Sequence, residues 1–214
     1  MQHTNTNFKD RTDAGMQLAD ALTGQGIKAD IVLALPRGGV PVGMIVAKKL
    51  GLPLKLYLVR KIGHPYNDEF AIGAVTENGM IMNETLHANP DYLDNAIRKE
   101  RERIREMKEV FGNTAIENDI FNNRVILVDD GIATGTCVEL AINELRKSGA
   151  KAIIVAVPVC PLTTEDKIRK IADKLITLKR PAHFAGIGAY YENFTQLADN
   201  QVVELTKKSP IKAT

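Results

Sequence analysis

The sequence predicts an α/β fold in which a mostly parallel sheet is covered by helices on both faces. Short continuous apolar runs, such as Ile31–Leu35 and Val125–Val128, are typical of strands that are buried on both faces. Segments with helical spacing separate these runs, and this alternation favours parallel strands joined by crossover helices. The 214 residues, of which 44% are hydrophobic and 25% charged, suit one packed domain of generous size.

The first quarter of the chain alternates helix and strand. Ala14, Leu18 and Leu22 recur at helical spacing, and Gly24 and Gly26 are typical of a helix end. The elements expected next are a strand at Ile31–Leu35, a loop at Pro36–Gly39, a helix at Val40–Leu50 that Gly51 ends, and a strand at Leu54–Val59.

A hairpin and a long charged helix are expected in the middle of the chain. Ala71–Val75 and Met80–Met82 flank an Asn-Gly pair, which is a strong hairpin signal. Asn89 and Pro90 then open a helix over 91–111, whose apolar stripe predicts a solvated helix docked on the core. An RNA-binding surface, or a contribution to a neighbouring subunit's site, remains an alternative for this helix.

The strand and helix pattern returns after a polar linker at 113–123. Parallel sheets bind ligands at the carboxyl ends of their strands, so Pro36–Gly39 and Asp129–Thr136 are the expected ligand loops. The elements predicted here are strands at Val125–Val128, Ile153–Val157 and Leu175–Leu178, with helices at Val138–Lys147 and Glu165–Ile171.

Composition excludes several classes of protein. The net charge of +2 gives no reason to expect nucleic-acid binding, and no apolar run approaches the ~20 residues that cross a bilayer. Cys137 and Cys160 have neither C-x-x-C nor zinc-type spacing, so a disulfide framework is not expected, and we expect Cys137 to be a packing residue. Met1–Asn7 lacks the apolar core of a signal peptide, which favours a cytoplasmic protein.

The loop after Val125–Val128 carries the chemistry. Asp129 and Asp130 put two carboxylates at the end of a buried strand, and the following loop leads directly into a helix. Its glycines allow several N–H groups to converge beside the positive helix N-terminus, which predicts a phosphate site. A Walker lysine is absent, and so is a G-x-G-x-x-G dinucleotide motif. A sugar monophosphate, its hydroxyls bound by the two carboxylates, fits best.

Val125–Thr136 resembles the phosphoribosyl pyrophosphate signature of type I phosphoribosyltransferases. The resemblance implies that Asp129 and Asp130 bind the donor's ribose and, with Arg37, serve catalysis. It also implies nucleotide metabolism and salvage. The 5′-phosphate would lie on Gly131, Ile132, Ala133, Thr134, Gly135 and Thr136.

Leu35–Gly39 resembles the pyrophosphate loop of the same family. The resemblance places Arg37 and Gly38 against the diphosphate, with Arg60 and Lys61 opening a mobile basic lid over residues 60–69. It implies Mg²⁺ as cofactor, held mainly by substrate and water. No dedicated protein ligands are expected, although Asp129 and Asp130 are the candidates for contact with the ion.

The family resemblance also implies a domain plan and an acceptor region. We expect one domain over residues 8–214, with a core to about residue 180, an inserted lid and hairpin at 60–82, a tail or hood at 181–214, and a flexible 1–7. A homodimer is expected. In the tail, Tyr190, Tyr191 and Glu192 are candidate acceptor contacts, although a last strand packing its rings on the sheet fits equally well.

Three functions remain open, of which a phosphoribosyltransferase acting on a nucleobase or amine leads. The second is a non-catalytic regulatory protein on the same fold that senses phosphoribosyl pyrophosphate or nucleotides and binds RNA or DNA. The third is a different enzyme that binds a nucleoside monophosphate. Hypoxanthine-type members resemble one another in an acidic residue at the position of Ala133, so adenine or a pyrimidine is the favoured acceptor. A contribution of His64 to the site is left open.

Overall fold

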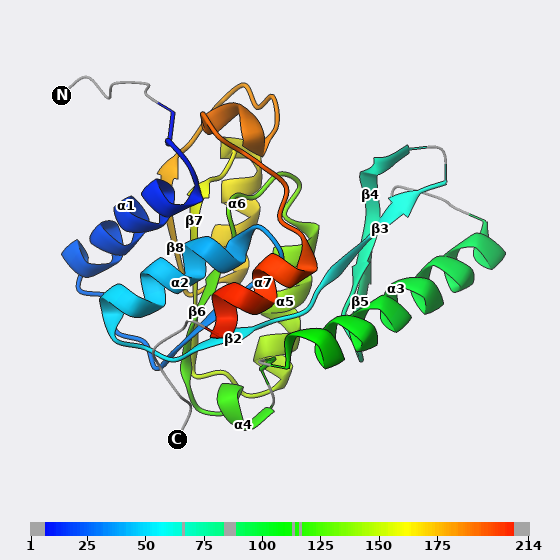
Figure 1. Ribbon diagram of the computed structural model, residues 1–214. Coiled ribbons are helices and arrows are strands. Elements are labelled where there is room, and N and C mark those ends of the chain that lie inside the picture. The colour runs from blue at the N-terminus through cyan, green and yellow to red at the C-terminus, as the bar shows by residue number, and fades with distance from the viewer. Residues whose placement is uncertain (1–6, 66, 84–88, 113, 116, 208–214) are drawn as a thin grey trace.

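The computed structural model describes residues 7–65, 67–83, 89–112, 114–115 and 117–207, and Figure 1 shows its arrangement. A five-stranded parallel sheet has the order β2-β1-β6-β7-β8, and a separate three-stranded sheet has the order β3-β4-β5. The predicted α/β class with a mostly parallel sheet is confirmed, and the small additional region is this second, antiparallel sheet.

The parallel sheet forms the core because its strands are buried on both faces. The central strands β1 and β6 pair in parallel from Ile31 opposite Val125 to Ala34 opposite Val128. All four residues of β1 are buried, as the continuous apolar run predicted. The five strands are β2 (Leu54–Leu56), β1 (Ile31–Ala34), β6 (Arg124–Val128), β7 (Ala152–Val159) and β8 (Lys174–Lys179).

Helices cover both faces of this sheet. On one face α5 (Thr136–Lys147) and α6 (Leu162–Ile171) pack on alternate strand residues such as Leu33 and Leu127. On the other, α1 (Arg11–Gly24), α2 (Gly39–Leu50) and α7 (Asp199–Lys207) pack on the intervening residues. Because β1 and β6 run parallel, the two loops that follow them open at the same edge of the sheet.

The second sheet and α3 (Pro90–Phe111) form an arm that projects from the parallel sheet in Figure 1. Ile104 of α3 is buried against Ile62, Ile72 and Val75 of the sheet. The predicted hairpin is confirmed, since Val75 pairs with Met80 across the turn. The strands of the arm are β3 (Arg60–His64), β4 (Asn67–Val75) and β5 (Met80–Met82).

Three elements differ from the sequence prediction. Arg60–His64, expected to open a mobile loop, is strand β3, because Ile62 is fully buried and Gly63 accommodates a register shift against β4. The polar linker contains the short helix α4 (Glu117–Ile120). The strand expected to reach Val59 ends at Leu56.

The tail beyond residue 180 forms no strand within its described part. It contains the 3-10 helix η1 (Ile187–Tyr190), a single bridge between Phe8 and Tyr191, and α7. Helix α7 was not predicted. Only Val202 of this helix is buried, and its sequence therefore shows no wide apolar stripe that would predict a helix. Part of the expected flexible terminus (1–6) and the last residues of the tail (208–214) lie outside the described residues.

None of the described helices combines the length and the apolar character that a bilayer span requires.

Candidate functional site

The two predicted ligand loops meet at the carboxyl ends of β1 and β6. The backbone N–H of Leu35 donates to the Val128 carbonyl oxygen at 2.9 Å, so the loops leave the sheet side by side. A Cβ on Gly38 would lie 2.0 Å from Oδ2 of Asp130, and one on Gly39 would lie 2.7 Å from the Val128 oxygen. Only glycine fits between the loops, and this places the backbone of the first loop directly against the carboxylate of the second.

The loop from Gly131 to Thr136 has the geometry of an anion site. Gly135 has a φ of +80° and precedes the first residue of α5, where the helix dipole places partial positive charge. Among the described residues, none accepts a hydrogen bond from the N–H groups of Ala133, Thr134 or Gly135. The hydroxyls of Thr134 and Thr136 lie 3.2 Å apart at the same place. These groups could converge on a phosphate. The phosphate role of this loop stays a prediction of the sequence.

Helix α6 holds this loop in position from behind. The Thr164 hydroxyl donates to the Ala133 carbonyl oxygen at 2.6 Å. A Cβ on Gly135 would lie 2.9 Å from the Thr164 methyl carbon, so the two elements are in close contact. The loop is thus fixed by tertiary contacts before any ligand binds.

The two aspartates of the motif have different surroundings. Asp129 is half-buried and accepts a hydrogen bond from the backbone N–H of Asp130 at 2.8 Å. The side chain of Asp130 is 9% exposed, and its Oδ2 lies 2.7 Å from Nε of Arg11. An ion pair therefore engages Asp130, while Asp129 is the more accessible carboxylate.

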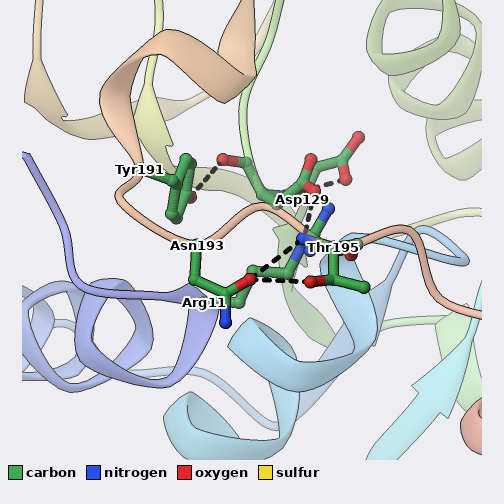
Figure 2. A network of polar contacts seen from close by, with 6 residues as sticks. Arg11, Asp129, Tyr191, Asn193 and Thr195 are labelled. Atoms are coloured by element: carbon green, nitrogen blue, oxygen red, sulfur yellow. Dashed lines mark hydrogen bonds and ion pairs between the residues drawn. The ribbon is translucent and has the colours of Figure 1, made fainter.

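Arg11 is itself fixed by two segments of the chain, the loop after β6 and the tail. Besides Asp130 it donates from Nη1 to the Thr195 carbonyl oxygen at 2.8 Å, and its guanidinium lies 3.9 Å from the centre of the Phe194 ring. Figure 2 shows Arg11 from α1 and Tyr191, Asn193 and Thr195 from the tail gathered beside Asp129. The tail and the first helix together enclose the acidic pair.

Burial raises the pKa of both carboxyls in this pair. The charge of Asp130 raises the pKa of Asp129 further. The guanidinium of Arg11 opposes the rise at Asp130 by supplying opposite charge and donating a hydrogen bond. The site therefore holds negative charge more readily on Asp130 than on Asp129.

The tail residues expected to contact an acceptor divide into two groups. Tyr191 is 5% exposed, with its ring between Phe8 and Phe194, and its hydroxyl donates to the Asp130 carbonyl oxygen at 2.6 Å. The expectation that Tyr191 stacks on a base is corrected, because burial leaves its ring no free face. Tyr190 is half-buried, and Glu192 is exposed.

The basic residues expected at the diphosphate come together at the other side of the Pro36–Gly39 loop. Arg37 and Arg60 line one cavity of about 490 Å³, although they are far apart in sequence. Arg60 and Lys61 also line a neighbouring cavity of about 530 Å³. The peptide bond between Pro36 and Arg37 is cis.

Cys137, the second residue of α5, has no activated thiol. Burial, followed by the charge of Asp129, raises its pKa to about 11, and Lys61 and Arg60 act in the opposite direction. The packing role expected from the sequence agrees with this environment, since a reactive cysteine needs a lowered pKa.

The acidic pair suits a magnesium ion that arrives with a phosphorylated substrate. No three His, Cys, Asp or Glu side chains converge among the described residues. Magnesium is commonly held by one or two carboxylates together with substrate phosphates and water. The half-buried Asp129 beside the ligand loops is the residue that would contact such an ion.

Sequence reasoning missed Arg11, Thr164 and the hydroxyl role of Tyr191. Each acts over a long separation, and the Arg11–Asp130 contact spans 119 positions. No local pattern marks these residues, because a lone arginine early in an amphipathic helix is normally a solvated charge.

Comparison with known proteins agrees with this geometry. The family described as "Phosphoribosyl transferase domain" matches residues 5–193. The solved structure of TT1426 from Thermus thermophilus is 36% identical, with a TM-score of 0.76, over 95% of this chain and 99% of that one.

Two Mycobacterium tuberculosis proteins are similar to the chain: "Putative phosphoribosyl transferase MT0597" (strain CDC 1551 / Oshkosh) and "Putative phosphoribosyl transferase Rv0571c" (strain ATCC 25618 / H37Rv). Each is 38% identical over 201 residues, which is 92% of this chain and 45% of the relative. The chain thus spans about half the length of these curated relatives. The match over residues 5–193 assigns the family: the chain belongs to the phosphoribosyl transferase domain family.

Proposed function

We propose that the chain transfers the 5-phosphoribosyl group from phosphoribosyl pyrophosphate to a nitrogen acceptor and releases pyrophosphate. The observation that carries this proposal is the packing of Gly38 against the carboxylate of Asp130. This packing brings the loop that carries Arg37 next to the acidic pair and the phosphate loop. In phosphoribosyl pyrophosphate the ribose lies between a phosphate at C5 and a diphosphate at C1. The phosphate loop, the acidic pair and the loop of Arg37 would therefore meet the phosphate, the ribose and the diphosphate in turn.

The donor would bind across the ends of β1 and β6. Its 5′-phosphate would accept hydrogen bonds from the loop between Gly131 and Thr136, and its hydroxyls would donate to Asp129. Asp130 keeps one oxygen on Arg11, so it offers the ribose its remaining oxygen and a fixed negative charge. Arg37, Arg60 and Lys61 would meet the diphosphate. Charge-assisted contacts of this kind are the strong ones in a site.

The reaction proposed here breaks the bond between ribose C1 and the diphosphate oxygen, and the electron pair leaves with pyrophosphate. The acceptor nitrogen forms the new bond to C1 and gives up a proton to solvent or to a nearby base. Positive charge develops on the ribose ring, and the carboxylates of the acidic pair would stabilise it. When bound with the donor, Mg²⁺ would neutralise charge on the leaving diphosphate.

The acceptor is proposed to be adenine, a pyrimidine or a simple amine. Ala133 places no carboxylate in the phosphate loop, so the proton of a 6-oxopurine would find no base there. Tyr190 and Glu192 remain the tail residues with exposed surface for an acceptor, whereas Tyr191 is assigned to holding Asp130.

The experiment that tests this proposal is a panel of nucleobases and amines with phosphoribosyl pyrophosphate and MgCl₂, followed by release of pyrophosphate. Release with adenine, uracil or an amine, and its loss in the Asp129→Asn variant, would support the transferase. Release with hypoxanthine or guanine alone would contradict the argument from Ala133.

Binding without turnover would instead support the sensor. Calorimetry with phosphoribosyl pyrophosphate and MgCl₂ separates the two outcomes, because a sensor binds the donor and releases no pyrophosphate with any acceptor. Absence of donor binding would contradict the transferase and a sensor of the donor, and would favour an enzyme or a sensor that binds nucleotides. A homodimer belongs to the same proposal, and light scattering coupled to size-exclusion chromatography tests it.

A further inference from the structure

Helix α3 contributes side chains to the cavity that Arg37 and Arg60 line. The same cavity of about 490 Å³ is lined by Arg103 and Glu106 of α3 and by Asp199 of α7. Arg103 and Arg60 also line the neighbouring cavity. The sequence predicts α3 as a solvated helix docked by its apolar stripe, yet its charged face borders the expected diphosphate site.

Glu100 holds two of the three arginines together. Its Oε2 lies 2.8 Å from Nε of Arg60, and its Oε1 lies 2.8 Å from Nη1 of Arg103. The side chain of Glu100 is 12% exposed, whereas those of Arg60 and Arg103 are 33% and 46% exposed, so the carboxylate is the more enclosed partner in both contacts. A shared carboxylate between two guanidiniums fixes their positions and leaves their remaining N–H groups for another acceptor.

Asp199 makes a looser contact with the third arginine. Its Oδ1 lies 3.6 Å from Nη1 of Arg37, and the two side chains are 52% and 45% exposed. An exposed ion pair at this distance contributes little to stability and exchanges readily for another anion. The two acidic partners therefore differ, since Glu100 is held in place and Asp199 can be displaced.

The charges of the cavity lining explain why displacement matters. Three arginines face Asp199 and Glu106, so the lining is nearly balanced while Asp199 stays on Arg37. If a diphosphate replaces Asp199, three guanidiniums meet one ligand with several negative oxygens. Guanidinium groups suit phosphate because they donate two parallel hydrogen bonds.

We infer that α3 and α7 form a wall of the donor's diphosphate site: Arg103 is a third phosphate-binding arginine, Glu100 positions Arg60 and Arg103, and Asp199 is an internal anion that the diphosphate displaces. This inference rests on the proposed function, because it takes the ligand to be the diphosphate of the donor.

Calorimetry with two probes tests the inference. Inorganic pyrophosphate reports on the arginine cavity, and ribose 5-phosphate reports on the phosphate loop. Arg103→Gln is expected to weaken pyrophosphate binding about tenfold, which is the loss of one charge-assisted contact, and to leave ribose 5-phosphate binding unchanged. Arg105→Gln is the matched control, since Arg105 is an arginine of the same helix that lines neither cavity.

The two acidic residues are expected to act in opposite directions. Asp199→Asn should tighten pyrophosphate binding severalfold, because the competitor loses its charge. Glu100→Gln should weaken it while ribose 5-phosphate binding and the thermal midpoint stay the same, which a purely structural role would not produce. Weaker pyrophosphate binding in Asp199→Asn would overturn the displacement, and an unchanged affinity in Glu100→Gln would overturn the positioning.

The outcomes separate this inference from the proposed function. If the protein binds ribose 5-phosphate and releases pyrophosphate from the donor, but Arg103→Gln behaves as Arg105→Gln does, the inference is wrong and the function stands. If pyrophosphate does not bind at all, the inference is also wrong. If pyrophosphate binds through Arg103 and neither ribose 5-phosphate nor the donor binds, the cavity is an anion site and the proposed function is wrong.

Discussion

At the carboxylate end of the candidate site, the side chains of Arg11 and Asp130 are 12% and 9% exposed, whereas at the arginine end those of Arg37 and Asp199 are 45% and 52% exposed. The carboxylate end is held by Gly38, by α1 and by the tail, so its geometry exists before a ligand arrives. At the arginine end Glu100 pairs with Arg60 and Arg103, and the contact between Arg37 and Asp199 is the loose and exposed one. Under the proposed function, the fixed end would orient the sugar, and the exposed contact between Arg37 and Asp199 would adapt to the charged leaving group.

Removing the buried ion pair should produce the largest effect on stability. Asp130→Ala is expected to lower the free energy of unfolding by about 3 kcal/mol, because Arg11 would remain as a buried charge without its counter-ion. Arg37→Ala, at the exposed end, should change it by less than about 0.5 kcal/mol. Urea unfolding followed by circular dichroism measures both.

A double-mutant cycle isolates the ion pair. The variant with Arg11→Ala and Asp130→Ala should be more stable than the sum of the single losses implies, since the second change removes the uncompensated charge. Additive losses would show that the two side chains do not interact, and the contrast between the two ends would then be lost.

Asp129→Asn should separate stability from binding. We expect its free energy of unfolding to rise, because burial and the charge of Asp130 already disfavour a charged Asp129. Donor affinity should fall about tenfold to a hundredfold, since a charge-assisted hydrogen bond of roughly 1.5–3 kcal/mol is lost. Urea unfolding and calorimetry with phosphoribosyl pyrophosphate and MgCl₂ measure the two quantities. Lower stability with full affinity would place Asp129 outside the site.

The pH dependence of stability should differ between Asp129 and a surface aspartate. The pKa of Asp129 is raised in the fold, so its contribution is present below the unfolded pKa and is lost as pH rises through the folded value. Asp30, whose pKa Arg124 lowers to about 2, contributes above the unfolded pKa and loses its effect as pH falls through about 2. Unfolding measured from about pH 4 to about pH 8 should show wild type losing stability relative to Asp129→Asn.

The comparison with Asp30 supplies the control for this experiment. Asp30→Asn should differ from wild type by a constant amount over roughly pH 5 to 8, because Asp30 stays charged throughout that range in both states. A constant difference for Asp129→Asn as well would mean that the acidic pair is solvated in the folded protein.

The parts of the molecule that local patterns encode were predictable. The apolar run Val125–Val128 predicted a strand, and the residues to Thr136 predicted a loop that leads into a helix; the strand and the helix lie where they were expected. Gly39 and Arg37 follow β1 at the same edge of the sheet, because parallel strands end together.

The remaining features depend on contacts that no local pattern carries. Composition suggested a loop at Arg60–His64, but the burial of Ile62 against α3 makes it a strand. The role of Arg11 depends on the tail folding back over α1. Tyr191 was weighed as a stacking ring or a packing ring, and only the burial between Phe8 and Phe194 decides for packing.

Cys137 gives the smallest predicted effect, and it reports on both ends of the site at once. The charge of Asp129 raises its pKa, and Lys61 and Arg60 lower it, around a value of about 11. Asp129→Asn should therefore increase the thiolate fraction, and Lys61→Gln should decrease it. We expect changes of about twofold to threefold in the iodoacetamide rate at about pH 8.5, because thiolate is the reactive form.

Peptide mass mapping separates Cys137 from the buried Cys160, which serves as the internal control. If both variants shift the rate in the same direction, Cys137 responds to loosened packing and not to the charges of Asp129 and Lys61.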